Sequence, residues 1–177
     1  IIALMVALRT DMYLPVMMEI AIAVATIARN HGYDVLLLTG EEGPDAVRRV
    51  TGSGLADAMI LMDVELDDER LPLLRGTDQP SVLIGLPADT TGLTCVDLDF
   101  RATGALCVEH LAMLGHRDIA VIGEAPAVYE RHTGFAERTL DGLRSRAQEL
   151  GVRLLHRPCE GGYDAMAVTL ARILDER

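Results

Sequence analysis

The chain of 177 residues contains no lysine and no tryptophan, and only 3% of its residues are aromatic. A phosphate-binding loop of the GxxxxGK[ST] type needs a lysine and is therefore absent. Residues 52–54, Gly-Ser-Gly, follow a predicted helix and precede a predicted strand, the reverse of the order in a dinucleotide-binding loop. There is also no GxSxG sequence to present a nucleophilic serine. These absences exclude several common enzyme classes, and we expect no catalytic activity.

Cysteine and long hydrophobic segments are also scarce. The cysteines Cys95, Cys107 and Cys159 are odd in number and widely spaced, which favours free, mostly buried thiols in a reducing compartment, the cytoplasm. The longest apolar stretch, 15–28, is interrupted by polar residues and is shorter than the roughly 20 residues that span a bilayer. We therefore expect no membrane partner. The chain opens on a predicted strand without a start methionine or leader, so it is expected to be a fragment.

Neither a metal nor another cofactor is predicted. Cys107 and His110 are three residues apart on a predicted helix, but two further ligands are not evident, which favours a buried cysteine beside a packed histidine. The acidic run over 63–69 lacks the alternating ligands and the central glycine of a calcium loop. Acids at the start of a helix, where the helix dipole favours negative charge, account for it.

Negative charge dominates, with 27 acidic residues, 16 arginines and a formal net charge of −11. Residues 1–98 hold 15 acids and 6 arginines, whereas residues 99–177 hold 12 acids and 10 arginines. An acidic surface repels phosphate and cannot release counterions from DNA. Any contact with DNA must therefore come from a segment outside this sequence.

Half of the residues are hydrophobic, and apolar strands alternate with helices along the chain. This alternation is typical of parallel sheets covered by helices on both faces, which places the chain in the α/β class. Gly32, Gly115 and Gly151 follow three helices as stop signals. The predicted strands are 2–8, 33–38, 57–62, 80–85, 117–122 and 152–156. The predicted helices are 15–31, 43–51, 67–75, 99–114, 131–150 and 162–176.

Two lobes are predicted, 1–98 and 99–177. The turn-rich segment 87–92 precedes Cys95-Val96-Asp97-Leu98-Asp99, which we interpret as a crossing strand between the lobes. Asp99 can cap the helix that follows.

The most specific segment is 106–135, LCVEHLAMLGHRDIAVIGEAPAVYERHTGF. It predicts a helix, a tight turn, a buried strand over 119–122 and a loop. The residues on one face of that helix are Leu106, His110, Leu111 and Leu114. Arg131 is expected at the start of the next helix. Because the helix dipole disfavours a cation there by roughly 0.3–1 kcal/mol, this position suggests an acceptor outside the helix.

In this segment the chain resembles the ligand-binding core of the LacI/GalR family of bacterial transcription regulators. VEHLAMLGHRDIAVIG (108–123) and Arg131-His132-Thr133-Gly134-Phe135 resemble the family's LGHRxIAxIG and RxxGF patterns. Weaker similarities extend the resemblance to nearly the whole chain, namely Asp11 with Pro15, 31–39, 56–63 and 96–100.

The resemblance implies two Rossmann-like lobes of the type I periplasmic-binding-protein kind, the second of which is incomplete in this sequence. Ligands of such sheets collect outside the carboxyl ends of the strands. We therefore expect a pocket formed by the loops 9–15, 62–66, 86–94 and 123–131. The resemblance also implies an upstream helix-turn-helix, outside this sequence, that binds operator DNA.

Arg131 is the first candidate for an effector contact. The resemblance assigns it this role, and its guanidinium offers several fixed donors, each charge-assisted bond being worth about 1.5–3 kcal/mol. An ion pair with Glu124 or Glu130 is the alternative. Tyr13 and Tyr129 could stack on a sugar ring or a base, or could be partly buried anchors.

Three further residues complete the predicted effector site. Phe100 could form the floor of the pocket, and Val16 could line its wall, whereas Met17 is expected in the core. Asp63 could accept hydrogen bonds from ligand hydroxyls, and a solvated loop acid is the alternative.

One departure from the family pattern concerns the effector. The sugar-responsive proteins it resembles commonly place an aspartate after the fourth strand, in a pattern like VLID, whereas here Val82-Leu83-Ile84 is followed by Gly85. An acceptor for a sugar hydroxyl is therefore missing at this position. The loop 124–130 is also shorter than is usual in the family.

The first predicted helix is apolar on more than one side. One stripe consists of Val16, Ile20, Val24 and Ile27, and beside it lie Met18, Ile22 and Ala25. This apolar surface exceeds what one lobe needs. A second subunit packed on Met18, Ile22 and Ala25 would give the isologous dimer that the resemblance implies, and burial within one sheet layer is the alternative.

We therefore predict the effector-sensing and dimerisation core of a LacI/GalR-like, DNA-binding transcription regulator that binds a small polar metabolite, with a sugar as the first candidate. The main alternative is a periplasmic sugar-binding receptor for transport or chemotaxis, which has the same two-lobe architecture. The free-thiol pattern and the RxxGF motif favour the regulator. An α/β enzyme acting on nucleotides or sugars would need a catalytic acid, a base or a phosphate loop, and none is visible.

Overall fold

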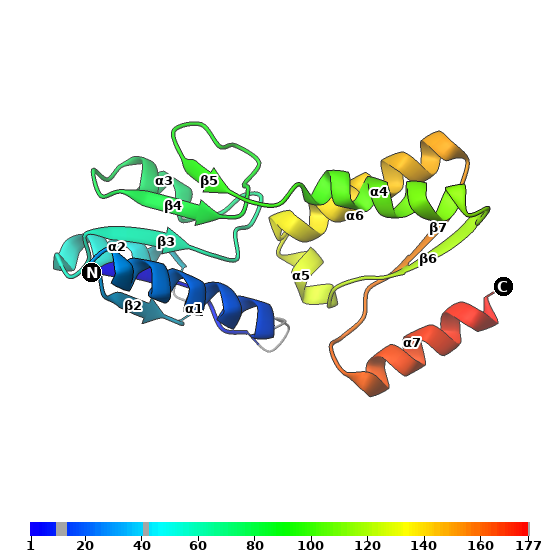
Figure 1. The fold of residues 1–177 in the computed structure, drawn as a ribbon, viewed down its shortest axis with the longest axis horizontal. Coiled ribbons are helices and arrows are strands. Elements are labelled where there is room, and N and C mark those ends of the chain that lie inside the picture. Colours follow the sequence, from blue (N-terminus) through cyan, green and yellow to red (C-terminus); the bar gives the residue numbers. More distant parts are fainter. Residues whose placement is uncertain (10–13, 41–42, 177) are drawn as a thin grey trace. The chain divides into compact units, whose positions relative to one another are not determined.

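The computed structural model describes residues 1–9, 14–40 and 43–176 (Figure 1). They form two compact units, Ile1–Asp97 and Leu98–Arg177. Each unit is a parallel sheet with helices packed on it, so the α/β class expected from the alternating pattern is confirmed. No helix within the described ranges is long and apolar enough to cross a membrane.

The first unit is built on a five-stranded parallel sheet with the strand order β2-β1-β3-β4-β5. Its strands are β1 (Ile2–Met5), β2 (Val35–Leu38), β3 (Ala58–Leu61), β4 (Ser81–Ile84) and β5 (Thr94–Val96). Its helices are α1 (Leu14–Asn30), α2 (Gly43–Ser53) and α3 (Leu71–Arg75). The chain moves outward from β1 to β2 and then back past β1 to β3. Since such crossovers are right-handed, α1 covers one face of the sheet and α2 and α3 the other.

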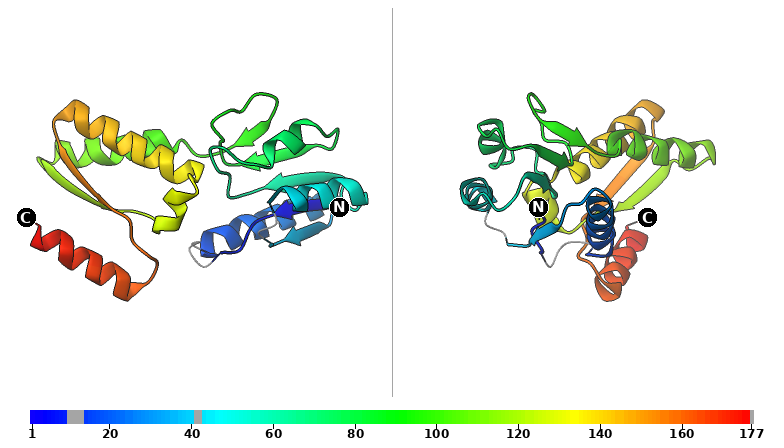
Figure 2. Two further views of the ribbon diagram at one scale, coloured as in Figure 1. Left: turned by 180° about the vertical axis from the view of Figure 1, so that it is seen from behind. Right: turned by 60° about the vertical axis from the view of Figure 1, so that its left-hand side comes forward.

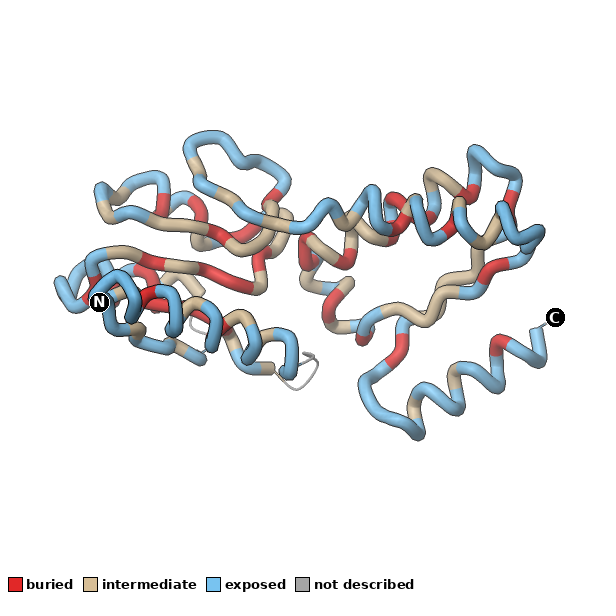
Figure 3. Tube along the Cα trace, viewed as in Figure 1, coloured by how far each residue is buried: buried red, intermediate tan, exposed pale blue. Residues whose placement is uncertain are grey.

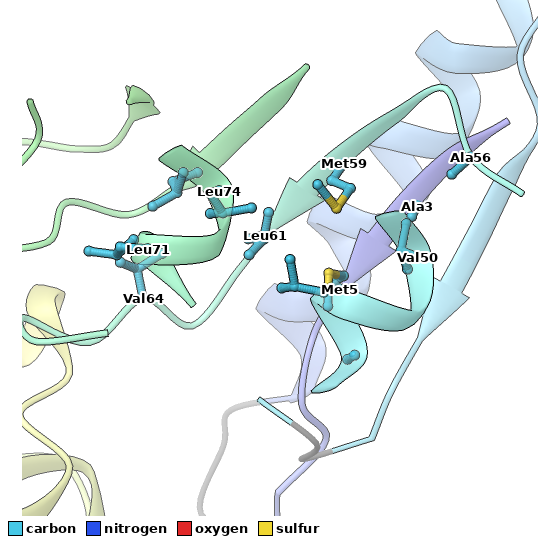
Figure 4. Packing of buried hydrophobic residues seen from close by; sticks show 12 residues of the cluster. Ala3, Met5, Val50, Ala56, Met59, Leu61, Val64, Leu71 and Leu74 are labelled. Atoms are coloured by element: carbon cyan, nitrogen blue, oxygen red, sulfur yellow. The ribbon is translucent and has the colours of Figure 1, made fainter. Parts of the chain in front are cut away.

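The core of this unit has two sides because successive strand residues point to opposite faces. Leu4 of β1 packs on the α1 side with Val6 and Met62. The opposite side is larger (Figure 4) and contains Ala3, Met5, Ala46, Val47, Val50, Ala56, Met59, Leu61, Val64, Leu71, Leu74 and Leu83. Burying each large apolar side chain is worth about 1.5–3 kcal/mol, so these contacts fix the helices on the sheet.

The end of the first sheet differs from expectation. Residues Thr94–Val96 form β5, which pairs in parallel with β4, with Val82 opposite Thr94. The predicted crossing strand is therefore the edge strand of this sheet, because Leu93 and Cys95 pack against the buried cluster beside α3. The predicted cap is confirmed: Asp99 Oδ1 accepts a hydrogen bond from the backbone N–H of Ala102 at 2.9 Å.

The buried side of α1 is also displaced from the predicted stripe. The residues that pack on the sheet are Met17, Ile20, Ala21, Val24 and Ala28. Val16 and Ile27, expected on the inner stripe, are 45% and 59% exposed. The buried residues Ala21 and Ala28 have small side chains, which let the helix approach the sheet closely. Met17 packs in the core, as predicted.

The second unit contains a pair of parallel strands, β6 (Asp118–Ile122) and β7 (Arg153–Arg157). Its helices are α4 (Phe100–Met113), α5 (Pro126–Glu130), α6 (Gly134–Leu150) and α7 (Tyr163–Asp175). Helices α4 and α6 lie side by side on one face of the pair, and α7 lies on the other (Figure 2). The core under α4 and α6 consists of Val108, Ile119, Leu143, Ala147 and Val152. Helix α7 is exposed over most of its length and contributes the buried Ile173 (Figure 3).

Of the four residues placed on one face of α4, Leu111 packs partly on the core and the other three are exposed. Leu106 and Leu114 are each 63% exposed, and His110 is exposed as well. The buried residues of this helix are Gly104 and Val108. Contact with α6 decides this orientation, because Gly104 allows the two helix backbones to approach closely.

The cysteines are less buried than expected. Cys159 is buried, Cys95 is half-buried and Cys107 is exposed. Since Cys107 and His110 both face solvent, the predicted buried cysteine beside a packed histidine is wrong.

Candidate functional site

A pocket of about 400 Å³ opens in the first unit at the carboxyl ends of β1, β2 and β3. In open parallel sheets ligands bind at this edge, next to the point where the strand order reverses. The pocket is strongly polar. Its charged lining residues are Arg9, Arg49, Arg70, Asp63, Glu65, Asp68 and Glu69.

Asp63, a predicted effector residue, lies in this pocket directly after β3. Its side chain is only 5% exposed and forms an ion pair with Arg9, so it is not a solvated loop acid. Its backbone is left-handed, with φ 53°, a conformation that aspartate tolerates better than most residues. Such backbone strain often accompanies functional sites, because the surrounding structure must hold it in place.

Arg70 and Asp68 form a second buried ion pair. Arg70 Nε donates to Asp68 Oδ1 at 2.8 Å and Arg70 Nη2 to Asp68 Oδ2 at 2.6 Å. Arg70 Nη2 also donates to the backbone oxygen of Asp63 at 3.1 Å. Burial alone would raise the pKa of Asp68, but the hydrogen bonds from Arg70 outweigh it and hold the pKa below its ordinary value. The pair therefore stays charged and fixes the turn that carries Asp63.

The end of β4 explains the missing aspartate of the family pattern. Gly85 has φ 135°, a region that side-chain-bearing residues rarely adopt. A Cβ atom there would lie 2.8 Å from Cβ of Val64, which is itself buried. Both the backbone and the neighbouring valine thus require glycine at this position.

Arg131 lies in the second unit, but not where the sequence placed it. A short helix that was not predicted, α5, occupies 126–130, and α6 begins at Gly134. Arg131 is the C-cap residue of α5, with φ −82° and ψ −3°. A cation is favoured rather than disfavoured at a helix C-terminus, so the argument from the helix dipole is wrong. Arg131 is half-buried, and His132 beside it has a left-handed backbone with φ 52°.

Tyr129 and Phe100 are both half-buried in the second unit. Tyr129 packs on the cluster around Val128, and its hydroxyl lies 3.1 Å from Nε2 of His156. Phe100, the first residue of α4, is tilted against Phe135 with ring centroids 5.6 Å apart. Both rings are therefore held in place by contacts within the second unit. That Tyr129 and Phe100 contact an effector stays a prediction.

The remaining predicted residues belong to the start of the first unit. Tyr13 lies outside the described residues. Val16 lies in the first turn of α1, is exposed and does not line the pocket. The residues predicted for dimerisation, Met18, Ile22 and Ala25, are all exposed on α1.

Sequence reasoning missed the segment after β2. Thr39, Gly40 and the start of α2 at Gly43 line the pocket, although the loop after β2 was not among those expected there. The rule that carboxyl ends of parallel strands meet at one edge would have included it. Arg9 lies in the loop 9–15 that was expected to line the pocket, but it was not selected as a site residue. The signal that could have selected it is a charged residue directly after a wholly apolar strand.

Comparison with known proteins identifies the fold. No family model matches the chain. An HTH-type transcriptional regulator from Mycolicibacterium smegmatis is 27% identical over 114 residues, which are 61% of this chain and 30% of that protein. A LacI family transcriptional regulator from Bifidobacterium animalis superposes with a TM-score of 0.82 at 21% identity, over 98% of this chain and 62% of that one.

A third relative has a ligand in its structure. The Cra transcriptional dual regulator from Pseudomonas putida, in complex with fructose 1-phosphate, superposes with a TM-score of 0.74 at 18% identity, over 99% of this chain and 64% of that one. The chain therefore spans less than two thirds of these relatives. It has the fold of LacI-family transcriptional regulators.

Proposed function

We propose that this chain, with its LacI-family fold, is the effector-sensing and dimerisation core of a DNA-binding transcriptional regulator, and that its effector is a small neutral sugar or a similar hydroxyl-rich metabolite. The observation that carries the proposal is the buried, ion-paired Asp63 in a polar pocket at the carboxyl edge of the first sheet. The names of the similar proteins, all regulators, support the same function class.

The charges of the pocket support a neutral ligand. Three arginines and four acids line it, so the charges nearly balance. A sugar hydroxyl can accept a hydrogen bond from a guanidinium and donate one to a carboxylate at the same time. The fructose 1-phosphate bound by the similar regulator supports a sugar as the ligand class.

The dimer and the DNA contact complete the proposed regulator. Met18, Ile22 and Ala25 form an exposed apolar surface on α1 that suits a second copy of the chain. Operator DNA would be bound by a helix-turn-helix upstream of this sequence, since the acidic surface of the chain repels phosphate.

Regulation would follow from a population shift between two conformations. The effector binds one conformation more tightly and thereby changes the spacing of the DNA-binding segments in the dimer. A coupling free energy of about 1–3 kcal/mol would change operator affinity by roughly 5–150-fold.

The test uses the full-length parent protein. Neutral monosaccharides and disaccharides, with sugar phosphates as charged counterparts, are screened by thermal unfolding, since a ligand at 100 times its Kd stabilises the folded state by about 2.7 kcal/mol. Sugars that stabilise the protein are then tested for release of an operator fragment, followed by fluorescence anisotropy. Stabilisation without any DNA binding by the parent protein would contradict the regulator and favour a sugar-binding receptor.

Arg131→Ala tests the effector contact predicted for Arg131 in the second unit. We expect a weaker effector response with unchanged dimerisation and unchanged DNA binding in the absence of effector. Arg153→Ala is the matched control, because Arg153 is an exposed, ion-paired arginine at the amino end of β7, away from the carboxyl edge. Equal loss of all three properties in Arg131→Ala would show that Arg131 is structural.

A further inference from the structure

A polar cluster in the second unit lies over Gly123, where β6 ends. The hydroxyl oxygen of Tyr129 in α5 accepts a hydrogen bond from the backbone N–H of Glu124 at 3.2 Å. The same oxygen lies 3.1 Å from Nε2 of His156 in β7, and the two rings meet edge to face with centroids 5.0 Å apart. The cluster thus joins α5 to the carboxyl ends of both strands.

Gly123 provides the space for this contact. A Cβ atom at this position would lie 2.4 Å from Nε2 of His156 and 2.5 Å from the hydroxyl oxygen of Tyr129. The backbone of Gly123 is not left-handed, so its conformation would accept another residue. Any larger residue here would displace the ends of these two side chains and break the cluster.

The contacts of the cluster suit a neutral His156 whose Nε2 accepts a hydrogen bond. Burial raises the pKa of the Tyr129 hydroxyl, which keeps its proton. The hydroxyl oxygen accepts from Glu124, and its proton is free to be donated to Nε2 of His156 when that nitrogen is unprotonated. In that arrangement the imidazole is the neutral tautomer with hydrogen on Nδ1. Burial, together with the charges of Arg144 and Arg157, lowers the pKa of His156 and favours this neutral form.

Helix α5 connects the cluster to Arg131. The helix has five residues, no side-chain cap at its N-terminus and one buried residue, Val128. The backbone N–H of Arg131 donates to the carbonyl oxygen of Ala127 at 3.1 Å, so the position of Arg131 follows that of α5. Such a short helix depends on its tertiary contacts.

We propose that neutral His156 is a positioning residue for Arg131, which holds Tyr129 and α5 in place and releases them when it takes up a proton. The proposal rests on the proposed function for the role of Arg131. The charged groups that face the cluster are Glu124 from the loop after β6, Glu137 and Arg144 from α6, and Arg157 from β7. A protonated His156 offers no acceptor to the Tyr129 hydroxyl and adds a positive charge beside two arginines.

The direction of the pH effect follows from linkage. The folded-state pKa of His156 lies below the ordinary value of 6.5, so the unfolded chain binds more protons as the pH falls. The stabilising effect of the cluster is therefore present above pH 6.5 and is lost as the pH falls through the lowered pKa.

The first measurement determines the tautomer and titration of His156 directly. The intact protein is labelled with ¹⁵N-histidine, and its two-bond proton–nitrogen correlations are recorded by NMR from pH 8 to pH 5. We expect hydrogen on Nδ1 and a titration below 6.5, the ordinary histidine value. Hydrogen on Nε2, or a titration at or above that value, overturns the proposal, and this result needs no variant.

The second measurement follows α5 by hydrogen exchange and mass spectrometry of the peptide 124–133, corrected for intrinsic exchange. Protection should fall about fivefold on acidification, the effect of one net hydrogen bond. His156→Ala and Tyr129→Phe should show the low protection at every pH. His156→Gln, which keeps an acceptor but does not titrate, should retain protection and lose the pH dependence.

His110→Gln is the matched control, since His110 is an exposed histidine on α4 in the same unit. It should behave as the unmodified protein. An unchanged pH dependence in His156→Ala overturns the proposal. These readouts contain no effector, so a failure here leaves the sugar-responsive function standing, and an absence of sugar binding leaves this result standing.

Discussion

At the scale of single residues, Asp63 shows how burial alters what an acid contributes. Its carboxylate is almost entirely removed from solvent and paired with Arg9, which is itself about a fifth exposed. Removing one partner of such a pair leaves the other desolvated without compensation, and this costs far more than losing a surface ion pair. The left-handed backbone adds a second requirement that aspartate and asparagine meet better than alanine.

Two substitutions at Asp63 separate the contribution of its charge to stability from that of its left-handed backbone. Asp63→Asn should lower the free energy of unfolding by about 2 kcal/mol, below the range for fully buried pairs because Arg9 retains some solvent contact. Asp63→Ala should cost about 1 kcal/mol more, because alanine tolerates a positive φ less well. Urea unfolding followed by circular dichroism measures both. Equal losses would show that φ at this position is not strained, and no loss in either would show a surface-like pair.

At the scale of elements, the contact between α4 and α6 is set by two glycines. A Cβ atom at Gly104 would lie 2.3 Å from the backbone oxygen of Thr139, and one at Gly142 would lie 2.0 Å from the backbone oxygen of Arg101. Each glycine therefore faces the backbone of the other helix. Glycine in a helix interior costs about 1 kcal/mol relative to alanine, so close packing must compensate for it twice here.

Gly104→Ala and Gly142→Ala should each destabilise the chain, by about 1–3 kcal/mol, because overpacking outweighs the better helix propensity of alanine. Gly52→Ala is the control: Gly52 lies in α2, and nothing would come within 4 Å of an added Cβ atom. That change should stabilise the chain by about 0.5–1 kcal/mol. Thermal unfolding of the three variants gives the sign in each case, and stabilisation by all three would contradict the close helix contact.

The same elements show what the sequence could predict. Strands and helices followed from apolar runs and glycine stops, and Gly151 indeed ends α6 in the left-handed conformation with φ 63°. The resemblance to LacI-family regulators is confirmed by the structural comparisons. Helix α5 was missed because its five residues are too few to show a helical period. The orientation of α4 was missed because its contact side is marked by a glycine, whereas hydrophobic patterns count large residues.

The candidate site was less predictable than the fold. A strand pattern locates the carboxyl edge of a sheet, and this was enough to select Asp63. It does not indicate that Arg9 pairs with that acid, since these two residues are far apart in the sequence. Nor does it indicate that Arg70 holds the backbone of Asp63, since that contact depends on the turn between β3 and α3. The sequence shows that Gly85 replaces the aspartate of the family pattern. It does not show the reason, which is the close approach of Val64 in the folded chain.

At the scale of the whole molecule, α1 presents the surface proposed for a second copy. Ile22 is 62% exposed near the middle of the helix, between Met18 and Ala25. A helix in contact with a single sheet has no need of apolar residues on its outer side. The proposed dimer would remove this surface from water.

If the proposed dimer forms through α1, Ile22→Asp should convert it into a monomer, because a charge in the centre of an apolar interface cannot be solvated. Leu106→Asp is the control, since Leu106 is equally exposed, at 63%, on α4. Light scattering coupled to size exclusion gives the mass of each variant. A dimer that persists in Ile22→Asp would exclude α1 as the interface, and dissociation of both variants would point to a nonspecific effect.

Because all strands of the first sheet are parallel, their carboxyl ends lie on one side of the sheet and their amino ends on the opposite side. The pocket occupies the carboxyl edge, whereas the turns that enter the strands, such as that at Gly54, lie at the amino edge. Gly54 has φ 64° and open space around it, so additional residues can be inserted there without displacing a core residue. A fluorescent protein inserted after Gly54 would keep every residue of the pocket lining intact. The sheet thus offers a position at which a binding event could be converted into an optical signal.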